Sequence, residues 1–234
     1  MTRAEVLRDL VARGREFDTA RLHELADELG LPISDLFVIA GHPVPARLLP
    51  PDRDREVMRD FAYRVTFCDH AQLSSLRDFV SCLASTNPAR AGELPRDAEA
   101  APIGVDGFPR IFDGLLRNRG FRRVPDLPFT GMSRSTINGM LSGRWYSLPQ
   151  LKTIAGPLGW EFADLAAVAG EPLGTYGVGP VLCHHVGRVY VAAIPLTTAQ
   201  LMQAAVEADR RSGREDQGAW RPWVANLCPD GSSP

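Results

Sequence analysis

An internal repeat constrains the fold of this chain more than any other feature. The segment LHELADELGLPISDLFVIAGHP (22–43) aligns without a gap on LKTIAGPLGWEFADLAAVAGEP (151–172), and nine of the 22 positions are identical. In each copy, apolar residues recur every three or four positions and a glycine follows the run, a pattern typical of a helix that ends at glycine. A short turn and a second helix, closed by Gly-x-Pro, complete each copy. The pattern predicts two copies of one helical pair.

The similarity between the copies extends upstream. Residues 2–22 resemble 133–151 if two residues are inserted. The first copy therefore begins at the third helix of a longer unit and lacks the two opening helices. Either the module is degenerate, or a partner or a later segment of the chain completes it. The first helix of this copy carries Glu5 and Asp9, whose carboxylates repel phosphates, so we expect it to serve packing or assembly.

The second copy lies within a longer series of helical patterns. Residues 108–120 carry an apolar stripe at helical spacing and predict a first helix. Residues 122–131 are expected to form the second helix, and 132–143 the third, with Ser133 as its N-cap. The repeated pair supplies helices four and five. Residues 108–172 thus predict a five-helix unit.

Two segments of this unit, MSRSTINGMLSG (132–143) and SLPQLKTIAGPLGWEFADLAAVAG (147–170), carry a family resemblance. They resemble the Cro/C1-type helix-turn-helix domains of the xenobiotic-response-element (XRE) class of bacterial transcriptional regulators, over about residues 108–172. Members of that family fold as five helices, and the third helix lies in the major groove of DNA. The resemblance implies this role for residues 133–142.

The chain departs from the family pattern at three positions. Pro125 and Pro128 fall in the expected second helix, and a proline inside a helix costs about 3 kcal/mol, so this helix is expected to be short or irregular. Gly139 stands where the family often has a polar or basic side chain. We therefore expect one base or phosphate contact to be absent there.

The third helix has an apolar and a polar face. Ile137, Met140 and Leu141 are spaced to face the core, which leaves the polar side chains outward. Arginine can form two hydrogen bonds to guanine, and asparagine two to adenine; each such pair contributes ~1–3 kcal/mol to discrimination against the wrong base. Serine hydroxyls at the start of a helix are suited to binding phosphates. The predicted DNA-contacting residues are Ser133, Arg134, Ser135, Thr136, Asn138 and Ser142, with Arg122, Arg123 and Arg144 on the phosphate backbone.

Charge is distributed unevenly along the chain. The net charge is −2, but residues 108–152 hold eight basic and two acidic side chains, a net of +6 that leaves the rest at −8. A basic module on an acidic protein is the pattern expected for local duplex binding.

The remaining segments predict helices and one hairpin. Residues 54–83 have helical spacing, and 84–107 are rich in alanine, proline and glycine, as in a linker. Val, Ile and Tyr dominate 179–196, with Gly187 in mid-run, which favours a β-hairpin. Residues 197–211 predict a helix capped by Thr197 or Thr198.

The predicted fold class is mainly α, with a five-helix Cro/C1-type helix-turn-helix domain, a degenerate helical repeat and a small C-terminal β-hairpin and helix. The domain boundaries follow from these segments. They are a helical N-terminal domain (1–83), a linker (84–107), the DNA-binding domain (108–172), a hairpin-plus-helix element (173–211) and a tail (212–234).

Motifs for enzymatic or metal chemistry are absent from the sequence. It contains no nucleophile-elbow, P-loop, zincin or dinucleotide motif, so we expect no enzymatic activity, no cofactor and no catalytic residues. On a strand, Cys183 and His185 would share a face, but no second pair stands at ligand spacing, and we expect no metal. Four scattered cysteines and the lack of any run of 18 apolar residues favour a cytoplasmic protein with reduced thiols and no membrane contact.

The expected function is that of a sequence-specific regulator of transcription, a repressor that binds double-stranded DNA. Because one short helix gives limited specificity, a homodimer on a palindrome is the economical arrangement. Residues 179–211 are the candidate dimerisation or ligand-sensing element, and the N-terminal half is the alternative. An unknown protein or small molecule is the candidate effector. The competing hypothesis is a helical protein-interaction module, antitoxin-like or a developmental assembly factor, that has lost DNA binding.

Overall fold

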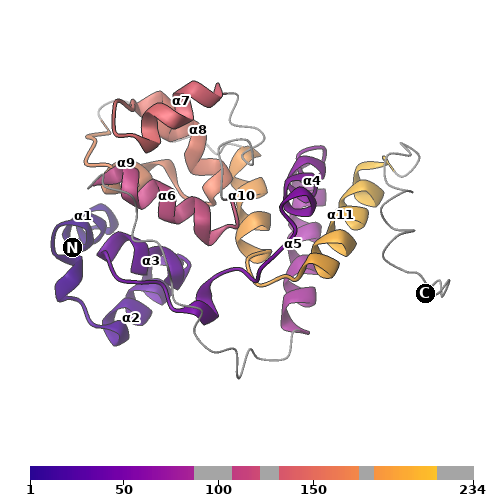
Figure 1. The fold of residues 1–234 in the computed structure, drawn as a ribbon, viewed down its shortest axis with the longest axis horizontal. Coiled ribbons are helices and arrows are strands. Elements are labelled where there is room, and N and C mark those ends of the chain that lie inside the picture. Colours follow the sequence, from indigo (N-terminus) through magenta and orange to yellow (C-terminus); the bar gives the residue numbers. More distant parts are fainter. Residues whose placement is uncertain (87–106, 122–131, 174–181, 215–234) are drawn as a thin grey trace.

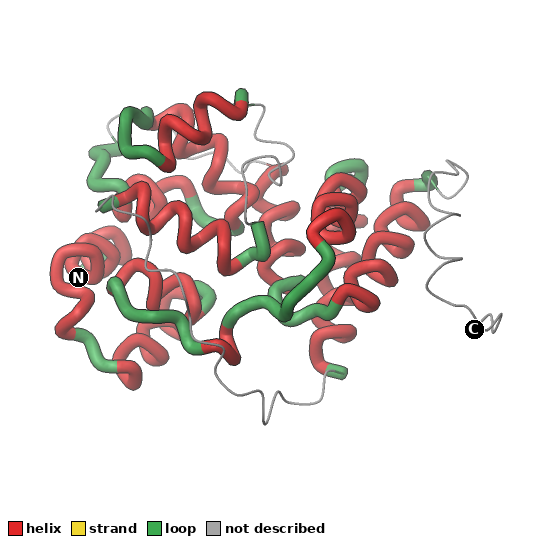
Figure 2. Tube along the Cα trace, in the orientation of Figure 1, coloured by secondary structure: helices red, strands yellow, loops and turns green. Residues whose placement is uncertain are grey.

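The computed structural model describes residues 1–86, 107–121, 132–173 and 182–214, and within these ranges all regular structure is helical (Figures 1 and 2). The mainly α fold class is confirmed. Among the described helices, none is long and apolar enough to span a bilayer. The α-helices are α1 (Arg3–Arg13), α2 (Thr19–Leu29), α3 (Ile33–Ala40), α4 (Arg55–Val65), α5 (His70–Ser85), α6 (Phe108–Asn118), α7 (Arg134–Leu141), α8 (Leu148–Leu158), α9 (Phe162–Val168), α10 (Leu182–Ala192) and α11 (Thr198–Ser212), with short 3-10 helices η1 (Gly14–Glu16) and η2 (Ala46–Leu48).

The helices form two lobes joined by α10. In Figure 1, α1–α3 and α6–α9 make the larger lobe, and α4, α5 and α11 stand together at the other end. Helix α10 packs on α8 in the larger lobe and on α5 in the smaller one. Helices from the predicted N-terminal domain (1–83) are thus divided between the lobes. Most of the predicted linker lies outside the described residues.

The two copies of the repeat adopt the same local structure, as predicted. Helices α2 and α8 end at Gly30 and Gly159, both in the left-handed region with φ of 59° and 72°. At the next position in each copy, the backbone N–H bonds back to an alanine carbonyl, from Leu31 to Ala26 at 3.1 Å and from Trp160 to Ala155 at 2.9 Å. This bond closes the helix and directs the chain into the second helix of the pair.

The copies pack against each other. Helix α1 lies against α9, and α3 lies against α6. The Arg110 guanidinium donates to the Val38 carbonyl at 3.0 Å, and Gly114 brings the α6 backbone into contact with the Val38 side chain. A later segment of the same chain therefore covers the first copy, which was one of the alternatives left open by the sequence.

The predicted β-hairpin at 179–196 is wrong, because residues 182–192 form helix α10. Val186, Val189, Tyr190 and Ala193 are all buried, at the i, i+3, i+4, i+7 spacing of a helix. The Tyr190 hydroxyl donates to the Ala62 carbonyl at 2.9 Å. Burial against two neighbouring helices outweighs the strand preference of valine and tyrosine. The predicted helix that follows is confirmed, with Thr197 as its N-cap.

Gly187 explains how α10 approaches α8 so closely. A Cβ atom at this position would collide with the carbonyl oxygen of Gly156 and the backbone of Gly159. Glycine in mid-run, which suggested a hairpin, instead permits a close crossing of two helices. This crossing joins the two lobes.

Replacing Gly187 with alanine tests the crossing. At an open helical site this change stabilises a protein by up to about 1 kcal/mol, because alanine has the higher helix propensity. Here we expect a loss of about 2 kcal/mol in the free energy of unfolding, since the new methyl group meets backbone atoms that cannot move independently. Urea unfolding measures the difference. Arg188→Ala, on the exposed side of α10, is the control and should change stability by less than about 0.5 kcal/mol. A stabilising Gly187→Ala would contradict the crossing.

A buried thiol lies between α4, α5 and α11 in the smaller lobe. The Cys68 Sγ donates to the Ala208 carbonyl at 3.6 Å. Burial, with the negative charge of Asp69 adding to it, raises the pKa of the Cys68 thiol to about 11. Cys82, by contrast, is exposed.

The two thiols are expected to react at different rates. At pH 8, iodoacetamide should alkylate Cys82 at least about a hundredfold faster than Cys68, since the thiolate is the nucleophile and Cys68 holds its proton. Peptide mass spectrometry over a time course separates the two sites. Comparable rates in the native protein would mean that α11 does not cover Cys68.

Candidate nucleic-acid interface

Helix α7, the predicted DNA-contacting helix, forms at the outer edge of the larger lobe (Figure 1). Ile137 and Met140 are buried, and Leu141 packs partly buried against the core, as the sequence predicted. These three side chains hold the helix by its inner face. The outer face is therefore fixed in orientation and exposed.

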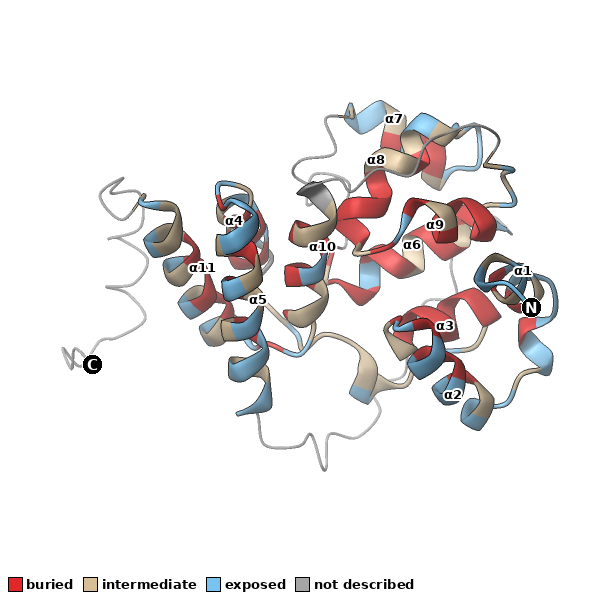
Figure 3. Ribbon diagram, turned by 180° about the vertical axis from the view of Figure 1, so that it is seen from behind, coloured by how far each residue is buried: buried red, intermediate tan, exposed pale blue. Residues whose placement is uncertain are grey.

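The structure places the predicted DNA-contacting side chains on that outer face. Arg134 and Asn138 are one helical turn apart and both exposed, so they lie side by side. Figure 3 shows the exposed surface along α7. The exposed members of the predicted set are Ser133, Arg134, Ser135, Asn138, Ser142 and Arg144, and Thr136 is half-buried.

Three hydroxyl groups gather at the start of α7. The Ser133 Oγ accepts a hydrogen bond from the Thr136 backbone N–H at 3.2 Å, which caps the helix as predicted. The same oxygen lies 2.7 Å from the Ser135 Oγ and 2.9 Å from the Thr136 Oγ1. Hydroxyl donors beside the positive end of the helix dipole form an environment that suits a phosphate oxygen.

The two described arginines of the site have no acidic partner. Neither Arg134 nor Arg144 makes a hydrogen bond or ion pair through its side chain within the described ranges, and the same holds for the Asn138 amide. Elsewhere in the structure, arginine side chains commonly pair, as Arg13 does with Glu16 and Arg21 with Glu24. The donors on α7 are thus available to an external acceptor.

Gly139 has a packing role that the sequence did not reveal. It is buried on the inner side of α7, and a Cβ there would stand 3.1–3.3 Å from the indole of Trp145. The Arg144 backbone N–H donates to the Gly139 carbonyl at 3.0 Å and turns the chain so that Trp145 lies over the glycine. A side chain at this position would point at Trp145, so Gly139 lets the indole pack closely on α7.

Much of the predicted basic surface is used inside the protein. Arg110 donates to the first copy. Arg119 is fully buried and bonds to Asp35. The sequence count of +6 therefore overstates the positive charge that faces outward. Arg122 and Arg123, with the whole expected second helix (122–131) and its two prolines, lie outside the described residues.

A buried ionic cluster fixes the lobe that carries α7. We define the Asp35 cluster as Asp35, Asn118, Arg119 and Trp160, all at most 1% exposed. Asp35 accepts four hydrogen bonds, from the Asn118 amide at 2.8 Å, from two Arg119 nitrogens at 3.0 and 2.8 Å, and from the Trp160 indole at 2.9 Å.

The rest of the Arg119 guanidinium is also satisfied. It donates to the Leu115 carbonyl at 2.8 Å and to the Leu158 carbonyl, from Nε at 2.7 Å and from Nη2. All five N–H donors of the arginine and all four acceptor positions of the carboxylate are thus occupied. The cluster ties α3 to the end of α6 and to the turn before α9.

The equivalent aspartate of the second copy makes the reciprocal contact. Asp164 accepts a 2.6 Å hydrogen bond from the Arg3 Nε of α1, in the first copy. Burial raises the pKa of the Asp164 carboxyl, and the Arg3 guanidinium lowers it in part. Asp164 thus binds an arginine of the first copy, and Asp35 binds Arg119 at the end of α6, in the five-helix unit that contains the second copy. The identity of Asp35 and Asp164 in the aligned repeat was the signal of this interface in the sequence.

The histidines on and beside α10 pack as rings rather than as a set of metal ligands. His185 stands on a helix, not a strand, with its ring centroid 3.9 Å from that of His70. Burial, and then the neighbouring His70, lower the pKa of the His185 imidazole. Over the described part of the chain, no three His, Cys, Asp or Glu side chains are placed to hold an ion.

Comparison with known proteins adds no relative. No protein-family model, curated protein or solved structure matches this chain. A function must therefore be inferred from the geometry of α7 and of the elements that hold it in place.

The two repeated aspartates provide a matched pair for mutation. Asp35→Asn leaves the Arg119 cation buried without its counter-charge, and we expect the free energy of unfolding to fall by about 3–5 kcal/mol. Asp164→Asn removes a pair whose Arg3 side chain is 41% exposed, so a loss of about 1 kcal/mol is expected. Chemical unfolding of both variants measures the contrast. Equal losses would contradict the dominant role of the Asp35 cluster.

Proposed function

We propose that this protein is a sequence-specific double-stranded-DNA-binding regulator of transcription, which acts as a repressor by occupying its operator. The proposal rests on one observation: α7 is anchored by its inner face, while the Arg134 guanidinium and the Asn138 amide on its outer face have no partner among the described residues. A helix that enters the major groove needs this division of faces.

Each part of the outer face has a chemical role in this proposal. Arg134 donates two hydrogen bonds, to the O6 and N7 of guanine, and the Asn138 amide bonds to the N6 and N7 of adenine. The hydroxyls of Ser133 and Ser135 and the free N–H groups of the first turn bind phosphate and set the helix in register. Arg144, just beyond the end of α7, binds the phosphate backbone.

The proposed regulator acts as a homodimer. A reading helix of eight residues covers few base pairs, and a two-fold dimer doubles the contacts on a palindromic site. Helix α10 packs against both α8 and α5, which leaves less of its surface available for a dimer contact. Helix α11 is the better candidate, since it lies at the outer end of the smaller lobe and leaves Val206 56% exposed.

A protein-interaction module is the second candidate, and one observation favours it. Two arginines that raised the predicted basic charge, Arg110 and Arg119, are engaged within the protein. The outward positive charge near α7 is correspondingly smaller, and Trp145, which packs on Gly139 of α7, is half-exposed. A surface of this kind also fits an acidic protein partner.

Substitutions on α7 separate the two functions. With full-length protein and duplexes selected from a random pool, Arg134→Ala and Asn138→Ala should each weaken binding by about 5–150-fold and relax the base preference at one position. Arg144→Ala should weaken binding to all duplexes alike and reduce the slope of log K against log salt by about one. Fluorescence anisotropy across a salt series measures both effects.

Arg59→Ala is the control for charge, because Arg59 is an exposed arginine on α4 in the other lobe. It should leave affinity and salt slope unchanged. If the double variant Arg134→Ala/Asn138→Ala binds duplexes as tightly as the parent, with the same slope, α7 does not contact DNA. The interaction-module hypothesis would then take its place.

A further inference from the structure

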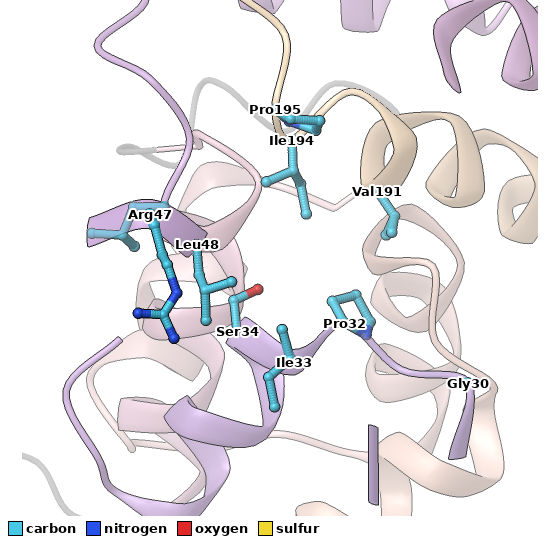
Figure 4. A pocket seen from close by; sticks show the side chains of 10 residues that line it. Gly30, Pro32, Ile33, Ser34, Arg47, Leu48, Val191, Ile194 and Pro195 are labelled. Carbon is cyan, nitrogen blue, oxygen red and sulfur yellow. The ribbon is translucent and has the colours of Figure 1, made fainter. Parts of the chain in front are cut away.

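A pocket of about 350 Å³ lies where the first repeat meets the end of α10 (Figure 4). Its walls come from three separate parts of the chain: the turn into α3, the short helix η2, and the junction between α10 and α11. The lining residues are Gly30, Pro32, Ile33, Ser34, Arg47, Leu48, Leu49, Val191, Ile194 and Pro195.

The walls of the pocket are almost entirely apolar. The side chains of Leu48 and Ile194 extend into it from opposite sides in Figure 4. Its volume falls at the lower end of the range of about 300–1,000 Å³ in which small-molecule sites are found. Such a space favours a compact hydrocarbon chain or a single ring over a large polar ligand.

One polar side chain inside the pocket has no partner. Ser34 is only 3% exposed, and its hydroxyl makes no hydrogen bond to any residue in the described part of the chain. Figure 4 shows the Ser34 Oγ directed into the pocket. The hydroxyl faces the pocket, and the described part of the protein does not use its donor, so an acceptor placed in the pocket gains a hydrogen bond from this group.

The electrostatics around Ser34 select a negative acceptor. The pocket opens beside the start of α3, whose N-cap residue Pro32 has no side chain to bond the first N–H groups. Arg47 is exposed at the edge of the pocket, and its guanidinium has no hydrogen-bond or ion-pair partner within the described ranges. No acidic side chain lines the pocket. A helix N-terminus and an unpaired arginine together favour an anion.

We propose that this pocket binds a small carboxylate with an apolar body, such as a medium-chain aliphatic acid or an aryl acid. The carboxylate accepts a hydrogen bond from the Ser34 hydroxyl and pairs with the Arg47 guanidinium. The hydrocarbon part lies against Leu48, Ile194 and Val191. Because the walls come from both the first repeat and the end of α10, the ligand contacts the larger lobe and the helix that joins the two lobes.

Calorimetric titration of the full-length protein tests the site, and it needs no DNA. The probes are sodium octanoate and sodium phenylacetate, with octanamide and phenylacetamide as neutral counterparts. We expect saturable binding of at least one carboxylate at one molecule per chain, and binding of its amide at least about tenfold weaker.

Three variants place the binding in this pocket. Arg47→Gln and Ser34→Ala should each raise the dissociation constant of the carboxylate about tenfold, and Leu48→Trp, which fills the space, should abolish binding. Arg188→Gln removes an exposed arginine elsewhere on α10 and should have no effect. Without ligand, Ser34→Ala should keep or raise the thermal stability, because the hydroxyl that it removes bonds to no residue in the described part of the chain.

Four results would overturn the proposal. Three concern binding: no saturable binding of either carboxylate, equal binding of the amide, or binding that Leu48→Trp leaves intact. The fourth is a clear loss of stability in Ser34→Ala without ligand, which would show that the hydroxyl already has a partner and would remove the reason for the site.

Discussion

The bond network around one buried aspartate determines how the larger lobe is built. An ionised carboxylate and a guanidinium away from water are unfavourable unless their polar atoms are satisfied, and in the Asp35 cluster every N–H of the Arg119 guanidinium and both oxygens of the Asp35 carboxylate are. The groups that satisfy it come from α3, from the end of α6 and from the turn before α9. Moving any of these elements away would leave a buried charge unbonded, so the cluster favours one packing of the two repeats.

In this packing, α7 carries polar side chains that have no hydrogen-bond partner in the described structure. Arginines that the sequence places near it are drawn inward, Arg119 to the Asp35 cluster and Arg110 to the Val38 carbonyl. Arg134 and Asn138 remain on the surface without partners in the described structure. The proposed function depends on this division of the basic residues. Some bind within the interface between the repeats, and Arg134 of α7 remains exposed in a fixed orientation.

Local periodicity made part of this structure predictable. The helical pairs, the inner face of α7 and the caps at Ser133 and Thr197 depend on residues a few positions apart, and all are as predicted. The hairpin prediction failed because the valine-rich residues around Gly187 are buried as a helix against α8 and α5, contacts that no local pattern records. The ion pair between Asp35 and Arg119 could not be predicted either, because the two residues lie 84 positions apart. A count of charged residues also does not show which of them are buried.

Selection of bound duplexes from a random pool tests the central claim most directly. If α7 contacts DNA as proposed, the parent protein enriches a motif with guanine and adenine at adjacent contacted positions, arranged as two half-sites about one helical turn apart. The Arg134→Ala/Asn138→Ala variant, run through the same selection, enriches no such motif. A pool that stays at its starting composition with the parent protein, or the same motif from both proteins, would contradict the account.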